Sequence, residues 1–424
     1  MSEIRYDLAV IGSGIVGLTS AFYIKKGNPD LKIVVIDKQH TFAQGQTGRS
    51  AAAFRDLFSS DTNYNLAASS IDFYSHIQKE LGYDIGMRYT GYMFLLTEGN
   101  EKLPVLEELS KKTRTRTLGR DELENNGNIK LVPDRDVSEI MGLKEIVGGF
   151  IGLNCGIIEP DLLSKYYYEE LIHMGVEFMF NTPVESISLE PFDKLDFPGE
   201  PFLWQKKTIG SLKTPRGDIV ADTYVVATDV WSSELLDPIG IDCHIRPKKR
   251  QVFQVSGEEI EKMLFSSRFS ESEIFPFTVL PSNSVYMRPA PREKSFWVGV
   301  ADDIGRDFSF QDDPMAERRY YDYNIIQVIQ SYIPAFSNSR VTGMWAGYYS
   351  YNTIDMNPYV FQTLNLIVAT GTSGSGILKG DSVGRTVAAL YNQEEYVNLT
   401  NNRKIKTSDL GVSERNVDRE RFVL

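Results

Sequence analysis

The pattern of apolar and polar positions is clearest near the start of the chain. Residues 4–11 form an apolar run that predicts a buried strand, residues 15–26 predict a helix, and residues 31–37 predict a second buried strand. A strand, a helix and a strand in this order predict parallel pairing with a right-handed crossover. Farther along, residues 60–81 predict another helix and residues 219–228 another buried strand. These elements indicate a parallel sheet with helices packed on it.

The middle of the chain has a different pattern. Strand-like runs at 251–255, 285–288 and 295–300 predict an antiparallel sheet, and residues 314–332 predict an aromatic-rich helix. We interpret residues 113–147 as charged and irregular. The chain therefore predicts an α/β fold in which a parallel sheet is joined to an antiparallel one.

A glycine-rich turn follows the first predicted strand: Gly12-Ser13-Gly14-Ile15-Val16-Gly17. In such a turn the first glycine makes the bend, the second lets the backbone approach a pyrophosphate, and the third lets the helix pack on the strand. The helix N-terminus then offers N–H groups and partial positive charge to the phosphate. Asp37, at the end of the second strand, can accept hydrogen bonds from ribose hydroxyls. The turn predicts a dinucleotide site without distinguishing FAD from NAD.

A second turn, Gly371-Thr372-Ser373-Gly374-Ser375-Gly376, follows a strand-like run at 364–369 and opens the last predicted helix. Its position near the C-terminus indicates that the chain returns to the same cofactor. A helix N-terminus stabilises a nearby negative charge, such as that of a reduced flavin, by about 0.3–2 kcal/mol. Two turns favour FAD over NAD, because a flavin needs its ring held as well as its phosphates.

Composition limits the partners. The chain has 424 residues, which allows about two or three domains, and a formal net charge of −12, which argues against nucleic acid or an anionic membrane surface. Its two cysteines, Cys155 and Cys243, cannot form a disulfide framework, and its four histidines show no metal-ligand spacing, so no metal site is expected. No apolar run reaches the ~18 residues that span a bilayer. We expect a cytoplasmic protein without a transmembrane segment, and peripheral association with a membrane is left open.

Residues 44–55, Gln-Gly-Gln-Thr-Gly-Arg-Ser-Ala-Ala-Ala-Phe-Arg, resemble the stretch that runs under the pyrophosphate and along the flavin in the D-amino-acid oxidase superfamily. The resemblance is to the type that includes sarcosine oxidase β, glycine oxidase and dye-linked L-proline dehydrogenase. Residues 156–161 resemble a helix start of that family, and residues 227–232 resemble its "A-x-G-x-W-S" motif, with Asp229 in place of the usual glycine. Residues 345–349 resemble a mitochondrial FAD-dependent oxidoreductase related to sarcosine dehydrogenase.

The resemblance implies noncovalent FAD and a Rossmann-like, glutathione-reductase-like FAD-binding domain interleaved with an α+β substrate domain on an antiparallel sheet. We expect the FAD-binding domain at 1–85, 152–235 and 342–393, the substrate domain at 86–151 and 236–341, and a C-terminal tail at 394–424. The residues expected to bind FAD are Gly12, Ser13, Gly14, Ile15, Val16, Gly17, Asp37, Lys38, Thr47, Gly48, Arg49, Ser50, Val184, Thr228, Trp231, Gly347, Ser373, Gly374, Ser375, Gly376, Ile377 and Leu378. Ser375 stands where the family has a histidine.

On the substrate side, the resemblance places an arginine that binds an amino-acid carboxylate at Arg55. Tyr286 corresponds to a pocket tyrosine of monomeric sarcosine oxidase, and Trp297 stands where that oxidase has its oxygen-activating lysine; core packing is the alternative for both. Tyr348 lies near the position of the cysteine that attaches flavin covalently there, and the absence of a nearby cysteine indicates noncovalent binding. Arg55, Tyr286, Trp297 and Tyr348 are the candidate catalytic residues.

These features together predict FAD-dependent oxidation of a secondary amino acid, with L-proline as first choice, by hydride transfer from the α-carbon to flavin N5. The replacement of the lysine by Trp297 favours a dehydrogenase that passes electrons to a dye, quinone or carrier protein rather than to oxygen. The alternatives are a sarcosine, N-methyl amino acid or glycine oxidase and, in another class, a flavoprotein assembly or scaffold factor with little catalysis. The sequence leaves open whether Leu424 closes the site or ends a frayed tail.

Overall fold

In the computed structural model, which describes residues 5–99, 103–126, 128–281, 284–302 and 304–421, two eight-stranded sheets organise the chain. The first sheet has six strands in the order β17 (Tyr359–Thr363), β18 (Leu366–Thr370), β11 (Gly217–Val226), β1 (Arg5–Ile11), β2 (Ile33–Ile36) and β8 (Glu177–Met179). An antiparallel pair, β10 (Lys207–Thr214) and β9 (Ser186–Pro191), continues from β11. Strands β18, β11, β1, β2 and β8 are parallel to one another. The predicted α/β fold with a parallel sheet is confirmed.

Both faces of the first sheet are buried, which explains the unbroken apolar run of its first strand. Along β1, Leu8 and Val10 point into one cluster of apolar side chains, and Ala9 and Ile11 point into another on the opposite face. Successive side chains of a strand point to opposite faces, so a strand covered on both sides needs apolar residues throughout.

Four helices contribute to the first of these clusters: α1 (Ile15–Gly27), α2 (Asp61–Lys79), α6 (Pro160–His173) and α11 (Gly376–Tyr391). The first and last helices of this set cross closely at two glycines. A Cβ at Gly384 would lie 2.5 Å from Cβ of Thr19, and one at Gly380 would lie 2.7 Å from Cγ1 of Ile15. This close approach brings the N-termini of α1 and α11, each preceded by a glycine turn, to one side of the sheet.

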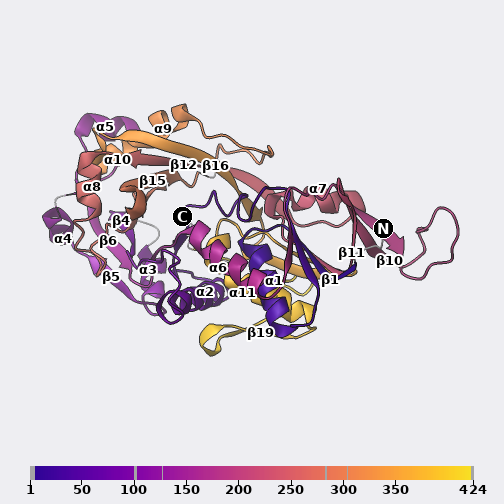
Figure 1. The fold of residues 1–424 in the computed structure, drawn as a ribbon. Helices are drawn as coiled ribbons and strands as arrows, with labels where there is room; N and C mark the ends of the chain where they lie inside the picture. Colours follow the sequence, from indigo (N-terminus) through magenta and orange to yellow (C-terminus); the bar gives the residue numbers. More distant parts are fainter. Residues whose placement is uncertain (1–4, 100–102, 127, 282–283, 303, 422–424) are drawn as a thin grey trace.

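The second sheet is largely antiparallel. Its strands are, in order, β16 (Arg340–Asn352), β12 (Ile245–Ser256), β15 (Ser295–Val300), β14 (Val285–Ala290), β13 (Phe277–Val279), β4 (Tyr92–Thr97), β6 (Ile146–Gly152) and β5 (Thr115–Leu118). Strands β1 and β11 lie towards one end of the molecule, and β4, β5 and β6 lie towards the opposite end (Figure 1). One face of the second sheet packs against α8 (Glu258–Leu264), α9 (Arg318–Asn324) and α10 (Ile326–Tyr332).

Two sequence predictions need correction here. The helix predicted over 314–332 is two helices, α9 and α10, that meet at Ile325. The segment 113–147 is not irregular: it contains β5, α4 (Arg120–Asn125), α5 (Arg135–Met141) and the start of β6. β5, α4 and α5 are short and bury few of their residues, namely Leu118 in β5 and Leu123 in α4, so they give little periodicity.

The remaining elements are short. They are α3 (Leu103–Leu109), α7 (Ser232–Leu236), the pair β3 (Ala53–Phe54) and β7 (Gly156–Ile157), and the hairpin β19 (Tyr396–Asn398) and β20 (Lys404–Lys406). The division into interleaved domains stays a prediction, and β16 of the second sheet lies across its boundary at residue 342. None of the helices among the described residues is long and apolar enough to cross a membrane.

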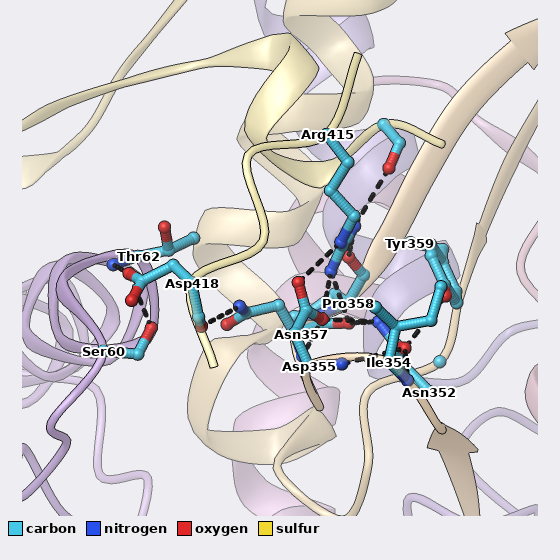
Figure 2. A network of polar contacts seen from close by, with 12 residues as sticks. Ser60, Thr62, Asn352, Ile354, Asp355, Asn357, Pro358, Tyr359, Arg415 and Asp418 are labelled. Atoms are coloured by element: carbon cyan, nitrogen blue, oxygen red, sulfur yellow. Dashed lines mark hydrogen bonds and ion pairs between the residues drawn. The ribbon is translucent and has the colours of Figure 1, made fainter. Parts of the chain in front are cut away.

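The described part of the C-terminal tail is held tightly on the body of the protein. The side chain of Arg415 is buried and forms a two-point ion pair with Asp355, at 2.7 Å from Nε to Oδ2 and 2.7 Å from Nη2 to Oδ1 (Figure 2). Its other N–H groups donate to the backbone oxygens of Gly411, Asn357 and Pro358. The polar composition of the tail therefore reflects buried pairing as well as exposure, a distinction that composition does not make.

Candidate functional site

A cavity of about 340 Å³ lies where the two sheets and the two glycine turns meet. Segments far apart in sequence line it: the turn before α1, the end of β2, residues 45–55, the end of β11, β16 and the turn before α11. Of the predicted FAD-binding residues, the described lining includes Gly12, Gly14, Ile15, Val16, Asp37, Lys38, Thr47, Arg49, Ser50, Val184, Thr228, Trp231, Gly347, Ser373, Gly374, Ser375, Gly376, Ile377 and Leu378. Of the predicted catalytic residues, it includes Arg55, Tyr286 and Tyr348.

The first glycine turn is shaped by contacts that a side chain would prevent. Gly12 has a φ of +100°, and a Cβ there would lie 2.6 Å from the carbonyl oxygen of Ala227. A Cβ at Gly17 would lie 1.9 Å from the carbonyl oxygen of Gly12. Gly17 therefore does not line the cavity but lets α1 start directly against the turn. Gly14, which precedes α1, brings no side chain to cover the N-terminus of the helix.

Asp37 and Ser13 support the same turn. One carboxylate oxygen of Asp37 accepts hydrogen bonds from the backbone N–H of Ser13 at 2.7 Å and from its hydroxyl at 2.6 Å. The other carboxylate oxygen accepts from the N–H of Gln39 at 2.9 Å. Ser13 is fully buried, and Asp37 also faces the cavity. Asp37 thus fixes the turn, and binding of a ribose hydroxyl by this residue stays a prediction.

Residues 45–55 run along the cavity, and contacts of Thr47, Gly48 and Arg49 hold the first half of the segment in place. The hydroxyl of Thr47 accepts a hydrogen bond from the N–H of Ile15 at 3.0 Å, which joins this segment to the start of α1. Gly48 lies behind the lining, where a Cβ would be 2.6 Å from the carbonyl oxygen of Ala43. The guanidinium of Arg49 pairs with Asp313 at 2.7 Å, and its aliphatic part packs against Gly347 of β16. The segment is therefore placed for contact with a long ligand.

Asp229 occupies the position of the family glycine with a backbone that suits glycine. Its φ is +50°, in the left-handed region. Its carboxyl lines the cavity and accepts a hydrogen bond from the hydroxyl of Ser350. Burial raises the pKa of Asp229 to about 6, although the hydrogen bonds from Ser350 and from the N–H of Val230 lower it. The backbone therefore adopts the left-handed conformation despite the aspartate, and it carries a carboxyl group whose ionisation costs free energy.

We expect Asp229→Asn to stabilise the protein at neutral pH. The folded-state pKa lies above the unfolded value, so ionisation of Asp229 costs free energy as the pH rises through about 6. Removing the charge should raise the free energy of unfolding by roughly 1–2 kcal/mol near neutral pH, and by progressively less below about pH 5. Thermal unfolding across this range measures the effect, with Asp193→Asn on an exposed loop as control. An equal gain at acid and neutral pH would contradict the explanation.

The second glycine turn packs against β16. Gly371 and Gly374 have φ values of +68° and +84°, and a Cβ at Gly374 would lie 2.5 Å from the ring of Tyr349. The hydroxyl of Ser373 accepts a hydrogen bond from the N–H of Asn352 at 3.0 Å, which fixes the turn to the end of β16. The first turn of α11 then lines the cavity through Ile377 and Leu378.

Aromatic side chains from three neighbouring strands form one wall of the cavity. The ring of Phe277 stacks on Tyr92 at a centroid distance of 4.1 Å and on Tyr286 at 5.4 Å. Tyr286 is buried, and burial raises the pKa of its hydroxyl. The guanidinium of Arg55 lies 5.6 Å from the ring of Tyr92 and 4.7 Å from that of Phe58. The wall excludes water beside a guanidinium, an arrangement that suits a small apolar molecule with a carboxylate.

The other two predicted catalytic residues, Tyr348 and Trp297, are not part of this aromatic wall. Tyr348 lines the cavity, and its hydroxyl accepts a hydrogen bond from the N–H of Gln311 at 2.8 Å. Trp297 is not among the described residues that line the cavity. Its ring meets that of Trp345 edge to face at 5.0 Å, and the guanidinium of Arg288 lies 4.2 Å from it. A direct role of Trp297 in the reaction stays a prediction, and its contacts here are those of packing.

Sequence reasoning missed several residues of the cavity. These are Phe58, Asn63, Tyr92, Arg250, Phe277, Tyr349, Tyr351, Lys379 and Glu420. Arg250 is buried, pairs with Asp302 at 3.2 Å, and donates a hydrogen bond to the hydroxyl of Tyr351 at 2.9 Å. Its position at the end of a basic run, Lys248-Lys249-Arg250, directly before the predicted strand 251–255, was the available signal, because a charged residue that becomes buried in a sheet needs a partner or a ligand.

The lining fits FAD on observations of this chain. The glycine cradle before α1 would be filled by any Cβ, and the N-terminus of α1 faces the cavity beside it. The N-terminus of α11 lines the same cavity, so two helix N-termini face one ligand site. One could hold the pyrophosphate through Gly12 and Gly14, and the other could face the ring.

Comparisons with known proteins agree with this reading of the site. Residues 7–390 match the family model described as FAD dependent oxidoreductase. The chain is 25% identical to FAD-dependent oxidoreductase domain-containing protein 1 of Xenopus laevis, over 91% of this chain and 79% of that protein. It is 24% identical to glycine oxidase of Bacillus subtilis (strain 168), over 92% and 94% of the two chains. The crystal structure of L-proline dehydrogenase from P. horikoshii superposes with a TM-score of 0.72 at 20% identity, over 96% and 97% of the chains.

Proposed function

Because this chain belongs to the family of FAD dependent oxidoreductases and binds FAD, we propose that it oxidises a secondary amino acid, with L-proline as the first choice. The observation that carries the proposal is the position of Arg55 beside the aromatic wall, in the same cavity as both glycine turns. Bound FAD would supply the acceptor for the hydride that leaves the α-carbon. The name of the similar solved structure, L-proline dehydrogenase, supports the choice of substrate.

The protein's own residues mainly bind and orient the substrate. Arg55 holds the carboxylate by charge-assisted hydrogen bonds, which fixes the position of the α-carbon. Tyr92, Phe277 and Tyr286 surround the apolar part of the substrate and keep water away from it. Tyr348 of β16 and Arg49 of residues 45–55 line the same cavity and would contact the bound cofactor. Fixed orientation and a dry cavity are what transfer of hydride requires of the protein.

We further propose that the electrons pass to a dye, quinone or carrier protein rather than mainly to oxygen. The support is the tryptophan at position 297, where the resemblance expects an oxygen-activating lysine. FAD is proposed to be noncovalent, because Cys155 and Cys243 are both buried and neither belongs to the described lining of the cavity. A cytoplasmic location is part of the same proposal.

Steady-state turnover with an artificial dye tests the proposal. The holoenzyme is assayed with L-proline, D-proline, sarcosine and glycine at equal concentrations, with and without oxygen. The expected result is the highest kcat/KM for L-proline and little oxygen consumption without the dye. A higher kcat/KM for sarcosine or glycine would contradict the choice of L-proline as substrate. Rapid oxygen consumption would contradict the proposed electron acceptor, and no turnover with any amine would favour the assembly-factor alternative.

A further inference from the structure

Lys379 is a buried amine that the proposed reaction has not used. It lies in the first turn of α11, its side chain is 1% exposed, and it lines the cavity. Its Nζ donates a hydrogen bond to the side-chain oxygen of Asn63 and lies 4.7 Å from the centroid of the Phe58 ring. Asn63, in the first turn of α2, is also buried and lines the cavity. Burying a lysine costs free energy unless its amine is paired or loses its proton.

The C-terminal segment brings a carboxylate to the same part of the cavity. Glu420 is 7% exposed and lines the cavity. One of its oxygens accepts hydrogen bonds from the N–H and the hydroxyl of Ser59, at 3.0 and 2.7 Å, and the other accepts from the N–H of Ser60 at 3.2 Å. These three donors fix the carboxyl group of Glu420 in position.

The anchoring of this segment makes Glu420 a permanent part of the wall. Asp418 accepts hydrogen bonds from the hydroxyl of Ser60 and the N–H of Thr62, both at 2.9 Å, and Arg415 is locked on Asp355 (Figure 2). The described part of the tail therefore contributes to the cavity wall through Glu420. Leu424, which the sequence analysis named as a residue that could close the site, lies outside the described residues.

The charged groups around Lys379 leave its protonation finely balanced. Burial lowers the pKa of Lys379, Glu420 raises it, Arg55 lowers it, and Asp355 raises it, for a pKa of about 7. These three charged groups come from three segments near the amine: the C-terminal segment, the loop before α2 and the loop after β16. Near neutral pH, Lys379 therefore spends much of its time as a neutral amine.

We propose that Lys379 accepts the proton that the ammonium group of the amino-acid substrate must lose before it can be oxidised. In this step one N–H bond of the substrate ammonium breaks, an N–H bond forms on Nζ, and the substrate is left as a neutral amine with its carboxylate on Arg55. The inference rests on the proposed function, because it takes its substrate from it. Glu420 is the positioning residue: it supports the ammonium form of Lys379 once the proton has moved.

Substrate binding itself drives this proton transfer. The guanidinium of Arg55 opposes a positive charge on Lys379, and a carboxylate bound to Arg55 cancels that opposition. The substrate ammonium, in contrast, leaves water for a cavity walled by aromatic rings, which favours its neutral form. Both changes favour the proton on Lys379. The overall charge of the complex does not change, so the transfer needs no exchange with solvent.

Binding of a carboxylate that has no amine tests the coupling without any turnover. Tetrahydrofuran-2-carboxylate is titrated into the holoenzyme by calorimetry at about pH 8, in two buffers of different ionisation enthalpy. Wild-type protein should take up a large fraction of one proton per carboxylate bound, and Lys379→Met should take up essentially none. Binding without proton uptake by the wild-type protein, or equal uptake by the variant, would overturn the proposal.

The pH dependence of anaerobic flavin reduction gives a second test. The second-order rate constant for reduction by L-proline should level off above about pH 7 in the wild-type protein. In Lys379→Met this rate constant should be roughly 10- to 100-fold lower at pH 8. It should rise again as the pH approaches the pKa of the free substrate amine, about 10. An unchanged profile, or a Lys379→Arg profile like that of the wild type, would overturn the proposal.

Glu420→Gln keeps the proposal testable if variants of Lys379 fail to fold. Loss of this carboxylate should move the acid limb of the wild-type profile to lower pH, because the ammonium form loses its support. A limb that stays in place, or moves to higher pH, would overturn the role of Glu420. If no amine reduces the wild-type flavin, the proposed function fails, whereas proton uptake with the amine-free carboxylate still reports on Lys379.

Discussion

Replacement of Arg55 by methionine is expected to raise the KM for L-proline by roughly 10- to 100-fold while FAD remains bound, because charge-assisted hydrogen bonds to a carboxylate contribute about 1.5–3 kcal/mol. The guanidinium lies at the edge of the aromatic wall, where little water can replace it. The loss should also reduce kcat, because the carboxylate fixes the position of the α-carbon. Steady-state kinetics with the dye, together with the flavin absorbance of each preparation, measure both effects.

Pyrrolidine provides the matched control for this prediction, because it is the same ring amine without a carboxylate. Its KM should be nearly the same in the wild-type protein and in Arg55→Met. Arg120→Met, at an exposed position on α4, should leave both substrates unaffected. If Arg55→Met raises the KM for pyrrolidine as much as that for L-proline, Arg55 supports the shape of the cavity and does not bind the carboxylate.

Gly17→Ala is expected to remove FAD from the protein or to weaken its binding by roughly 100-fold, since overpacking at a rigid contact costs about 3 kcal/mol or more. The added Cβ would lie 1.9 Å from the carbonyl oxygen of Gly12, so the turn and the N-terminus of α1 would have to separate. The ratio of flavin to protein absorbance and a titration of the apoprotein with FAD measure the loss.

Gly27→Ala in the same helix is the matched control. Its Cβ would meet only the side-chain amide of Asn392 at 3.7 Å, an ordinary contact. Alanine also favours a helix over glycine, so this variant should keep its FAD and its Tm. A Gly17→Ala protein with full flavin content and unchanged Tm would show that the turn does not hold the cofactor in the way described.

The framework of the cofactor site could be predicted from the sequence because local patterns encode it. The glycines at 12, 14 and 17 have distinct steric roles within a few residues of one strand and one helix. The residues of the substrate side were harder to find. Arg55 came only from a family resemblance. Phe277 and Tyr92 meet because β13 and β4 are neighbours in the sheet, although the two residues lie far apart in the sequence.

The C-terminal tail shows why composition alone misleads. Its residues are mostly polar, yet the side chains of Arg415 and Glu420 are buried, because each finds partners on loops distant in sequence. The burial of Lys379 could not be predicted either. Lys379 lies in the predicted helix after the second turn, and its burial depends on α2 and on the tail. No local periodicity reports such pairings. The long strand β16 also crosses a predicted domain boundary, because one continuous strand serves both the second sheet and the cofactor cavity.

Anaerobic reduction of the bound flavin by L-proline, followed by admission of oxygen, tests the central claim most directly. The account predicts that L-proline bleaches the oxidised flavin spectrum within the time of turnover. Oxygen should then restore the spectrum much more slowly than an added dye does. A flavin that L-proline and the other amino acids leave oxidised would contradict the account.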